Sequence, residues 1–182
     1  ILKKITIIFL YIFGNNLLAQ IMVFENFKDK ELKGWEFISD QVMGGISSGK
    51  YKLLEENDIK FLRMTGDVSL ENNGGFVQVR KKFTEKIESN FKVIRLNARG
   101  NNSDYFVHLR TSFTLLPWQY YQAKFSVSDE WKFYNLDLKN FQRSGLLLPK
   151  EINPKLIKSL ALVAFGREHV VKLDVANISL LD

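Results

Sequence analysis

The sequence predicts an all-β fold, a β-sandwich of the jelly-roll type. After residue 20, short stretches rich in β-branched and aromatic residues alternate between apolar and polar side chains, which is the pattern of half-buried strands. Clusters of turn-forming residues, such as Asn72-Asn73-Gly74 and Ser128-Asp129, separate these stretches. We find no pattern of a long amphipathic helix. About ten short strands at this spacing favour a sandwich or a jelly roll.

The alternating stretches predict these strands, in chain order: Ile21–Phe24, Trp35–Ser39, Lys50–Glu55, Lys60–Met64, Phe76–Lys82, Val93–Ala98, Tyr105–Thr111, Gln119–Ser126, Lys132–Leu138, Ser159–Phe165 and Val170–Leu180. The less regular segment Asn140–Pro154 is expected to hold a loop and a helical turn. From the apolar spacing we also expect five aromatic side chains to be largely buried: Trp35, Phe76, Phe125, Trp131 and Phe165.

Composition indicates one globular domain. The chain has 182 residues, 46% of them hydrophobic and 15 of them Phe, which is enough for a packed core. Its formal charge is +6, and it falls to +4 when Lys3 and Lys4 are left out. This mild excess does not point to nucleic acid as a partner. The absence of cysteine excludes disulfides, thiol nucleophiles and thiolate metal sites.

Residues 1–19 have the features of a secretory signal. Lys3-Lys4 precede the apolar run Ile5–Phe13, and Ala19 provides a small residue at a cleavage position. The run is too short to span a bilayer comfortably. We therefore expect export to a periplasmic compartment, with cleavage leaving a single domain over residues 20–182. A retained membrane anchor, or a first strand of the domain, is the alternative.

Two double-glycine segments form the first candidate site. Paired glycines permit unusual backbone conformations and close approach of a ligand or another chain. The first segment offers carboxylate, thioether, backbone N–H and hydroxyl groups, from Asp40, Met43, Gly44, Gly45 and Ser47. The second offers Asn73, Gly74 and Gly75. In the functional interpretation both loops meet at one rim. In the structural interpretation Asp40 caps its own turn, Met43 lies in the core and the glycines only permit tight turns.

Polar strand faces form the second candidate site. His108 and Arg110 alternate with apolar residues on one predicted strand, and Arg80 and Arg99 do so on two others. Arginine suits the recognition of carboxylate, phosphate or sugar hydroxyl groups. Nearby aromatic residues could act as stacking platforms: Trp118, Tyr120 and Tyr121. These residues would form one cationic surface only if their strands share a sheet; otherwise they belong to solvated faces.

Catalytic and metal-binding patterns are poor. The chain has two histidines, His108 and His169, and it lacks a Gly-x-Ser-x-Gly elbow, a phosphate-binding loop and a His-Glu-x-x-His run. Two scattered histidines without cysteine do not suggest zinc. We therefore expect a protein that is not an enzyme and that needs no cofactor or metal.

Several of these residues occur in an order that resembles the complex I intermediate-associated protein 30 family. The resemblance covers about residues 24–180 and rests on Trp35, the run Asp40–Ser47 and Gly74-Gly75-Phe76. It implies a galactose-binding-like jelly roll and a role in assembling respiratory complex I. Jelly rolls of this kind often carry a structural calcium between the first and last strands, and the matching carboxylates here are Glu25 and Asp174.

The leading functional hypothesis is a non-catalytic binding or assembly module. By resemblance, its partner would be a respiratory-complex subunit or an assembly intermediate. The alternative is a carbohydrate-binding module, in which exposed aromatic residues stack on sugar rings. In either case we expect membrane association only through a retained leader or through a partner.

Overall fold

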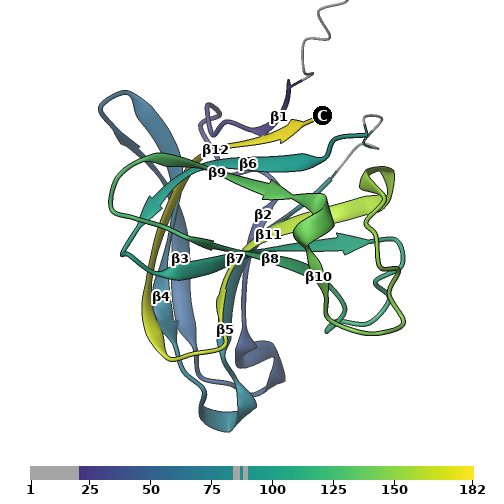
Figure 1. Ribbon diagram of the computed structural model, residues 1–182. Helices are drawn as coiled ribbons and strands as arrows, with labels where there is room; N and C mark the ends of the chain where they lie inside the picture. Colours follow the sequence, from purple (N-terminus) through teal and green to yellow (C-terminus); the bar gives the residue numbers. More distant parts are fainter. Residues whose placement is uncertain (1–20, 84–86, 88–89) are drawn as a thin grey trace, which may run out of the picture.

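The computed structural model describes residues 21–83, 87 and 90–182, and it confirms the all-β sandwich (Figure 1). Sheet A has the strand order β3-β4-β12-β6-β9, with β1 also pairing with β12. Its strands are β1 (Ile21–Glu25), β3 (Ser48–Glu56), β4 (Ile59–Val68), β6 (Val93–Gly100), β9 (Lys132–Asp137) and β12 (His169–Leu181).

Sheet B has the order β10-β8-β7-β11-β5-β2. Its strands are β2 (Trp35–Ser39), β5 (Phe76–Lys82), β7 (Asp104–Thr111), β8 (Tyr121–Ser126), β10 (Gln142–Arg143) and β11 (Ile157–Phe165). In the described part of the chain, four short 3₁₀ turns connect strands: η1 (Asp40–Met43), η2 (Glu71–Asn73), η3 (Leu138–Asn140) and η4 (Pro154–Leu156). All the strand pairs are antiparallel.

Each predicted strand is present, with ends that differ by a few residues. The short strand β10 was not predicted, because a two-residue strand carries no periodic pattern. The predicted leader lies outside the described residues, so export stays a prediction. Among the described residues, no helix is long and apolar enough to cross a membrane.

The core lies between the two sheets. Tyr105 and Tyr121 are among its largest buried side chains, and each hydroxyl is bonded. The Tyr105 hydroxyl donates to Asn101 Oδ1 (2.7 Å) and accepts from the backbone N–H of Lys172 (2.9 Å). Burial raises the pKa of Tyr105 to about 12. The Tyr121 hydroxyl donates to the carbonyl of Pro149 at 3.0 Å.

The expected burial is confirmed for Trp35 and Phe125, and it is wrong for the other three aromatic residues. Phe76 and Phe165 are only half-buried, and they pair across β5 and β11 on the face that points away from the core. Each lies one residue from an inward position, and one step along a strand moves a side chain to the opposite face. Trp131 is half-buried too, against the outer face of sheet A.

Candidate binding site

The outer face of sheet B, meaning the face turned away from the core, is built around the small residues of β11. This strand lies between β7 and β5, so its outward side chains are flanked on both sides. Ser159, Ala161 and Val163 are each at most 5% exposed, although they point away from the core. Larger outward residues of β5 and β7 rise beside them. The strand therefore forms a floor that the larger side chains on either side cover almost completely.

Two of the predicted site residues lie side by side across this floor, because they pair with the same residue of β11. Arg80 of β5 and His108 of β7 both pair with Ala161, and His108 pairs with Gln122 of β8. In the next row, Gln78 and Phe106 flank Val163. Gln122 was not singled out from sequence, although it alternates with the inward Tyr121 and Ala123.

His108 is held tightly by aromatic rings. Its imidazole stacks on the ring of Tyr120, with centroids 4.0 Å apart and planes inclined by 8°, and meets Phe165 edge-on at 5.2 Å. Burial lowers the pKa of His108 to about 4, although the neighbouring Gln122 amide opposes the shift. The imidazole is therefore neutral at pH 7. Its Nε2 atom and Oε1 of Gln122 are both buried, and apart from the contact between these two side chains neither atom has a hydrogen-bond partner among the described residues.

The two arginines of this face are already engaged. Arg80 forms an ion pair with Glu36 at 2.8 Å. Arg110 donates to carbonyls of the following loop, those of Thr114 and Leu116, at 3.0 Å each. Burial, and to a smaller degree the charge of Arg80, lowers the pKa of Arg110. Both arginines therefore shape the surface, and an anionic ligand would compete with the contacts that they make.

A polar pocket of about 240 Å³ opens where β7 and β8 of sheet B meet β9 of sheet A. Amide side chains dominate its lining, together with one carboxylate and one amine, in the set Phe106, Gln122, Ala123, Lys124, Asn135, Leu136, Asp137, Asn140 and Gln142. We call this the amide pocket. Amides offer both donors and acceptors and so suit ligands rich in hydroxyl groups. The sequence shows no sign of this pocket, because its residues come from separate strands and turns.

The glycine loops meet at the opposite end of the sandwich from the C-terminus, where η1 and η2 lie in Figure 1. The contact between them is Asp40, which is fully buried. Its carboxylate accepts hydrogen bonds from the N–H and hydroxyl of Ser47 and from the N–H groups of Gly75 and Phe76. Burial alone would raise the pKa of Asp40, but these hydrogen bonds outweigh it and lower the pKa.

The glycines of both loops fit around this carboxylate. A Cβ added at Gly45 would overlap the Asp40 carboxyl group, and one at Gly74 would lie 2.5 Å from Asp40 Oδ2. Gly44 and Gly75 adopt positive φ angles of 90° and 132°. Met43 is exposed, contrary to the structural interpretation, and Asn73 is exposed as well. The loops meet, as in the functional interpretation, but Asp40 turns its carboxylate toward the chain, which is closer to the structural interpretation.

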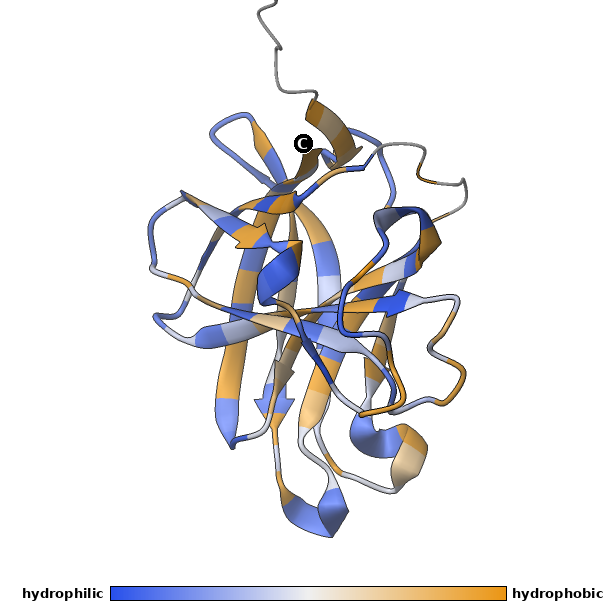
Figure 2. Cartoon of the chain, turned by 45° about the vertical axis from the view of Figure 1, so that its right-hand side comes forward, coloured by the Kyte–Doolittle hydropathy of each residue, from blue (hydrophilic) through white to orange (hydrophobic). Residues whose placement is uncertain are grey.

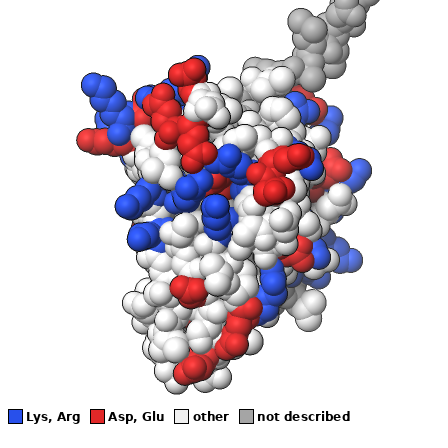
Figure 3. All heavy atoms as spheres, turned by 90° about the vertical axis from the view of Figure 1, so that its left-hand side faces the viewer, with Lys and Arg blue, Asp and Glu red and all other residues white. Residues whose placement is uncertain are grey.

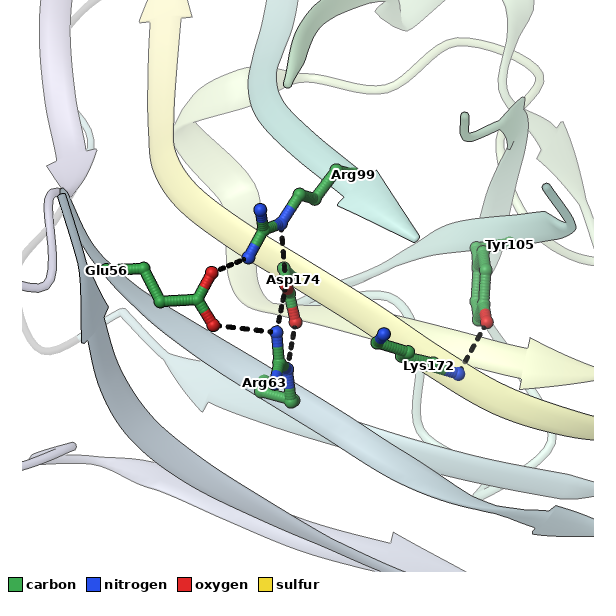
Figure 4. Close-up of polar contacts among 6 residues, drawn as sticks. All are labelled: Glu56, Arg63, Arg99, Tyr105, Lys172 and Asp174. Atoms are coloured by element: carbon green, nitrogen blue, oxygen red, sulfur yellow. Dashed lines mark hydrogen bonds and ion pairs between the residues drawn. The ribbon is translucent and has the colours of Figure 1, made fainter. Parts of the chain in front are cut away.

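Arg99 is not part of the outer face of sheet B, so the three predicted arginines do not converge. It lies on the outer face of sheet A, where Asp174 receives a bidentate pair from Arg63 (2.6 and 2.7 Å) and a bond from Arg99 (2.9 Å) (Figure 4). Glu56 bridges both arginines. The Arg99 guanidinium also covers the ring of Trp131 at 4.7 Å. Figure 3 views the side of β3 and β4, where basic and acidic groups intermix.

The remaining predicted residues lie in different parts of the protein and do not form one site. Tyr121 belongs to the core, because it follows Tyr120 by one position and therefore points to the opposite face. Trp118 is exposed in the loop after β7. The two carboxylates considered for calcium have cationic partners instead: Glu25 bonds to Lys81 at 2.5 Å, and Asp174 to the two arginines.

The two sheets form a galactose-binding-like jelly roll, and solved structures share it. A Family 11 carbohydrate-binding module of the cellulosomal cellulase Lic26A-Cel5E of Clostridium thermocellum matches with a TM-score of 0.73 at 12% identity, over 90% of this chain and 95% of that chain. A Family 11 module from Clostridium thermocellum in complex with a β-1,3-1,4-mixed-linked tetrasaccharide matches at 0.71 and 13%, over 90% and 95%. A mutant family 29 module matches at 0.54 and 11%, over 90% and 92%. Such low identities show the fold alone.

The family follows from the sequence match. Residues 24–175 match the family model described as Complex I intermediate-associated protein 30 (CIA30). Because this match spans most of the chain, the protein belongs to the CIA30 family. The search of curated proteins found no match.

Proposed function

We propose that the protein is a non-catalytic binding module, and that its ligand-binding surface is the outer face of sheet B with the adjoining amide pocket. The observation that supports this most is the pair of unpartnered buried atoms, His108 Nε2 and Gln122 Oε1. A buried polar atom without a hydrogen bond costs about 1–3 kcal/mol. Both atoms are covered by neighbouring side chains, so a partner that moves these side chains aside and supplies the missing bonds removes this cost, and the free energy of binding becomes more favourable.

For the partner, we propose an assembly intermediate of NADH:ubiquinone oxidoreductase, as the description of the family suggests. A binding role agrees with the chemistry of the site. His108 is neutral, and Asp137 is the single carboxylate among the described residues that line the amide pocket. An acid–base pair of carboxylates would need a second one within reach.

A carbohydrate is the second candidate ligand, and the amide pocket is the observation that favours it. Its amide side chains provide both hydrogen-bond donors and acceptors, which complement the hydroxyl groups of a sugar; they belong to Gln122, Asn135, Asn140 and Gln142. Tyr120 stacks on His108 at the edge of the same face and could extend the contact.

The test compares matched variants in two binding assays. Gln122→Leu and His108→Phe remove the unpartnered atoms, and His169→Phe is the control because His169 Nε2 is equally unpartnered but belongs to sheet A. If the missing bonds contribute about 1–3 kcal/mol, each site variant should weaken binding roughly 5- to 150-fold.

Crosslinking to membranes of the native host would identify a complex I intermediate, and a glycan array would identify a carbohydrate. The proposal fails if the two site variants bind as tightly as the control variant in whichever assay detects a ligand. Export with removal of residues 1–19 is a separate proposal, and N-terminal sequencing of protein from the native host tests it.

A further inference from the structure

Two neighbouring loops expose large apolar side chains. The β7–β8 loop, residues 112–120, and the β10 loop, residues 144–150, lie together on the right-hand side of Figure 1, and Figure 2 shows apolar stretches there. Ser144 joins the two loops through three hydrogen bonds of 2.9 Å each. Its hydroxyl donates to the carbonyl of Trp118 and accepts from the N–H of Tyr120, and its own N–H donates to the carbonyl of Tyr120. The exposed apolar side chains are Phe113, Leu115, Leu116, Trp118, Leu146 and Leu147. We call these six side chains the apolar loop pair.

These side chains stand at the tips of the loops. Leu115 is 83% exposed, Leu146 85% and Leu147 91%. Exposed apolar groups gathered in this way mark a surface that contacts a partner or a membrane.

The backbone beneath the tips is bonded within the loops themselves. Arg110 donates to the carbonyls of Thr114 and Leu116, and Gln119 Oε1 accepts from the N–H groups of Leu115 (2.8 Å) and Leu116 (3.0 Å). In the second loop, Arg143 donates to the carbonyls of Leu146 (2.9 Å) and Leu148 (2.5 Å). A segment that leaves water for lipid must satisfy its backbone groups internally, and these bonds do so for part of each loop.

Charge around the loops favours an anionic surface. Residues 111–128 and 138–150 contain no Asp or Glu, but they contain Lys124, Lys139, Arg143 and Lys150. Lys124 pairs with Asp104 at 3.4 Å and Lys139 with Asp137 at 3.9 Å, so the basic groups that the loop itself presents are Arg143 and the exposed Lys150, which Glu151 follows. Basic side chains beside exposed Leu and Trp are the combination that holds a peripheral protein at an anionic bilayer, where Trp prefers the headgroup region.

We propose that the apolar loop pair docks the domain onto a bilayer containing anionic lipid, with the leucines entering the acyl boundary and Trp118 at the headgroups. This contact is direct, unlike the sequence-based expectation of membrane association through a leader or a partner. It does not depend on the ligand of the outer face of sheet B.

Vesicle co-flotation with the full chain tests the proposal, using phosphatidylcholine vesicles with and without phosphatidylglycerol. The double variant Leu146→Ser/Leu147→Ser should lower the partition coefficient on anionic vesicles roughly 100-fold or more, because two leucine side chains no longer leave water. The controls Phe133→Ser and Val170→Ser replace side chains that are each 65% exposed but lie outside both loops. They should bind like the wild type.

Tryptophan fluorescence distinguishes membrane contact through the loops from membrane contact through the leader. Residues 1–20 contain no Trp, whereas Trp118 is 66% exposed and Trp35 only 5%. Vesicles with brominated acyl chains should quench wild-type emission, and Trp118→Phe should abolish most of this quenching. The proposal is overturned if bound protein shows no Trp118-dependent quenching, or if the leucine variant floats like the controls. It is also overturned if the loop residues are needed only to capture a purified protein partner and vesicles take up no protein.

Discussion

Replacing His108 with phenylalanine should remove an acid sensitivity that the fold creates. Burial lowers the pKa of His108 to about 4, whereas histidine in an unfolded chain has a pKa of about 6.5. Between these values the unfolded chain binds more protons than the folded protein, so the free energy of unfolding falls as the pH falls from 6.5 toward 4. At about 1.4 kcal/mol per pH unit, the loss between about pH 7 and pH 4.5 is roughly 2–3 kcal/mol.

Phenylalanine keeps a ring against Tyr120 but cannot take up a proton. At about pH 7 the variant should therefore be as stable as the wild type or slightly more stable, because a buried unpartnered nitrogen is gone. Urea unfolding at about pH 7 and about pH 4.5 measures both effects, with His169→Phe reporting on the other histidine. Equal acid losses in the wild type and in His108→Phe would refute the reasoning.

Three further changes have expected outcomes, each measured by denaturant unfolding. Asp40→Asn should destabilise the fold by about 2 kcal/mol or more, because an amide NH₂ would face N–H donors in a buried site; a change below about 0.5 kcal/mol would contradict this. Gly45→Ala should be clearly destabilising, because its Cβ overlaps Asp40, whereas the exposed Met43→Ala should be near neutral; equal effects would be inconsistent with the packing. Arg99→Gln should cost about 1–3 kcal/mol, because the buried Asp174 keeps only Arg63 as a cation, and no loss would show that Arg63 suffices.

The sequence predicted the strands well because apolar and polar residues alternate along each strand of a sandwich, and this alternation is visible locally. The meeting of the two glycine loops was one of two interpretations that the sequence left open, and the structure shows that the loops do meet. Sequence could not show that Asp40 is the point of contact, because the four donors to its carboxylate come from residues up to 36 positions away. The loops therefore turned out to enclose a buried carboxylate, a role that depends on the packing of two distant turns.

The polar faces show the same limit. Alternation correctly put His108 and Arg110 on one side of β7, and register then placed Arg80 beside them through Ala161. Alternation along a single strand could not reveal that Arg99 belongs to the other sheet.

The chain by itself determined the all-β class, the strand positions and the membership in one family, because these depend on local periodicity and on ordered motifs. The tertiary structure alone decided which faces share a sheet and which polar atoms are left without partners. It also decided that two loops separated along the chain by β8, β9, η3 and β10 expose their apolar side chains together. The physical reason is that strand pairing and desolvation join residues distant in sequence, and no local pattern records which strand becomes a neighbour.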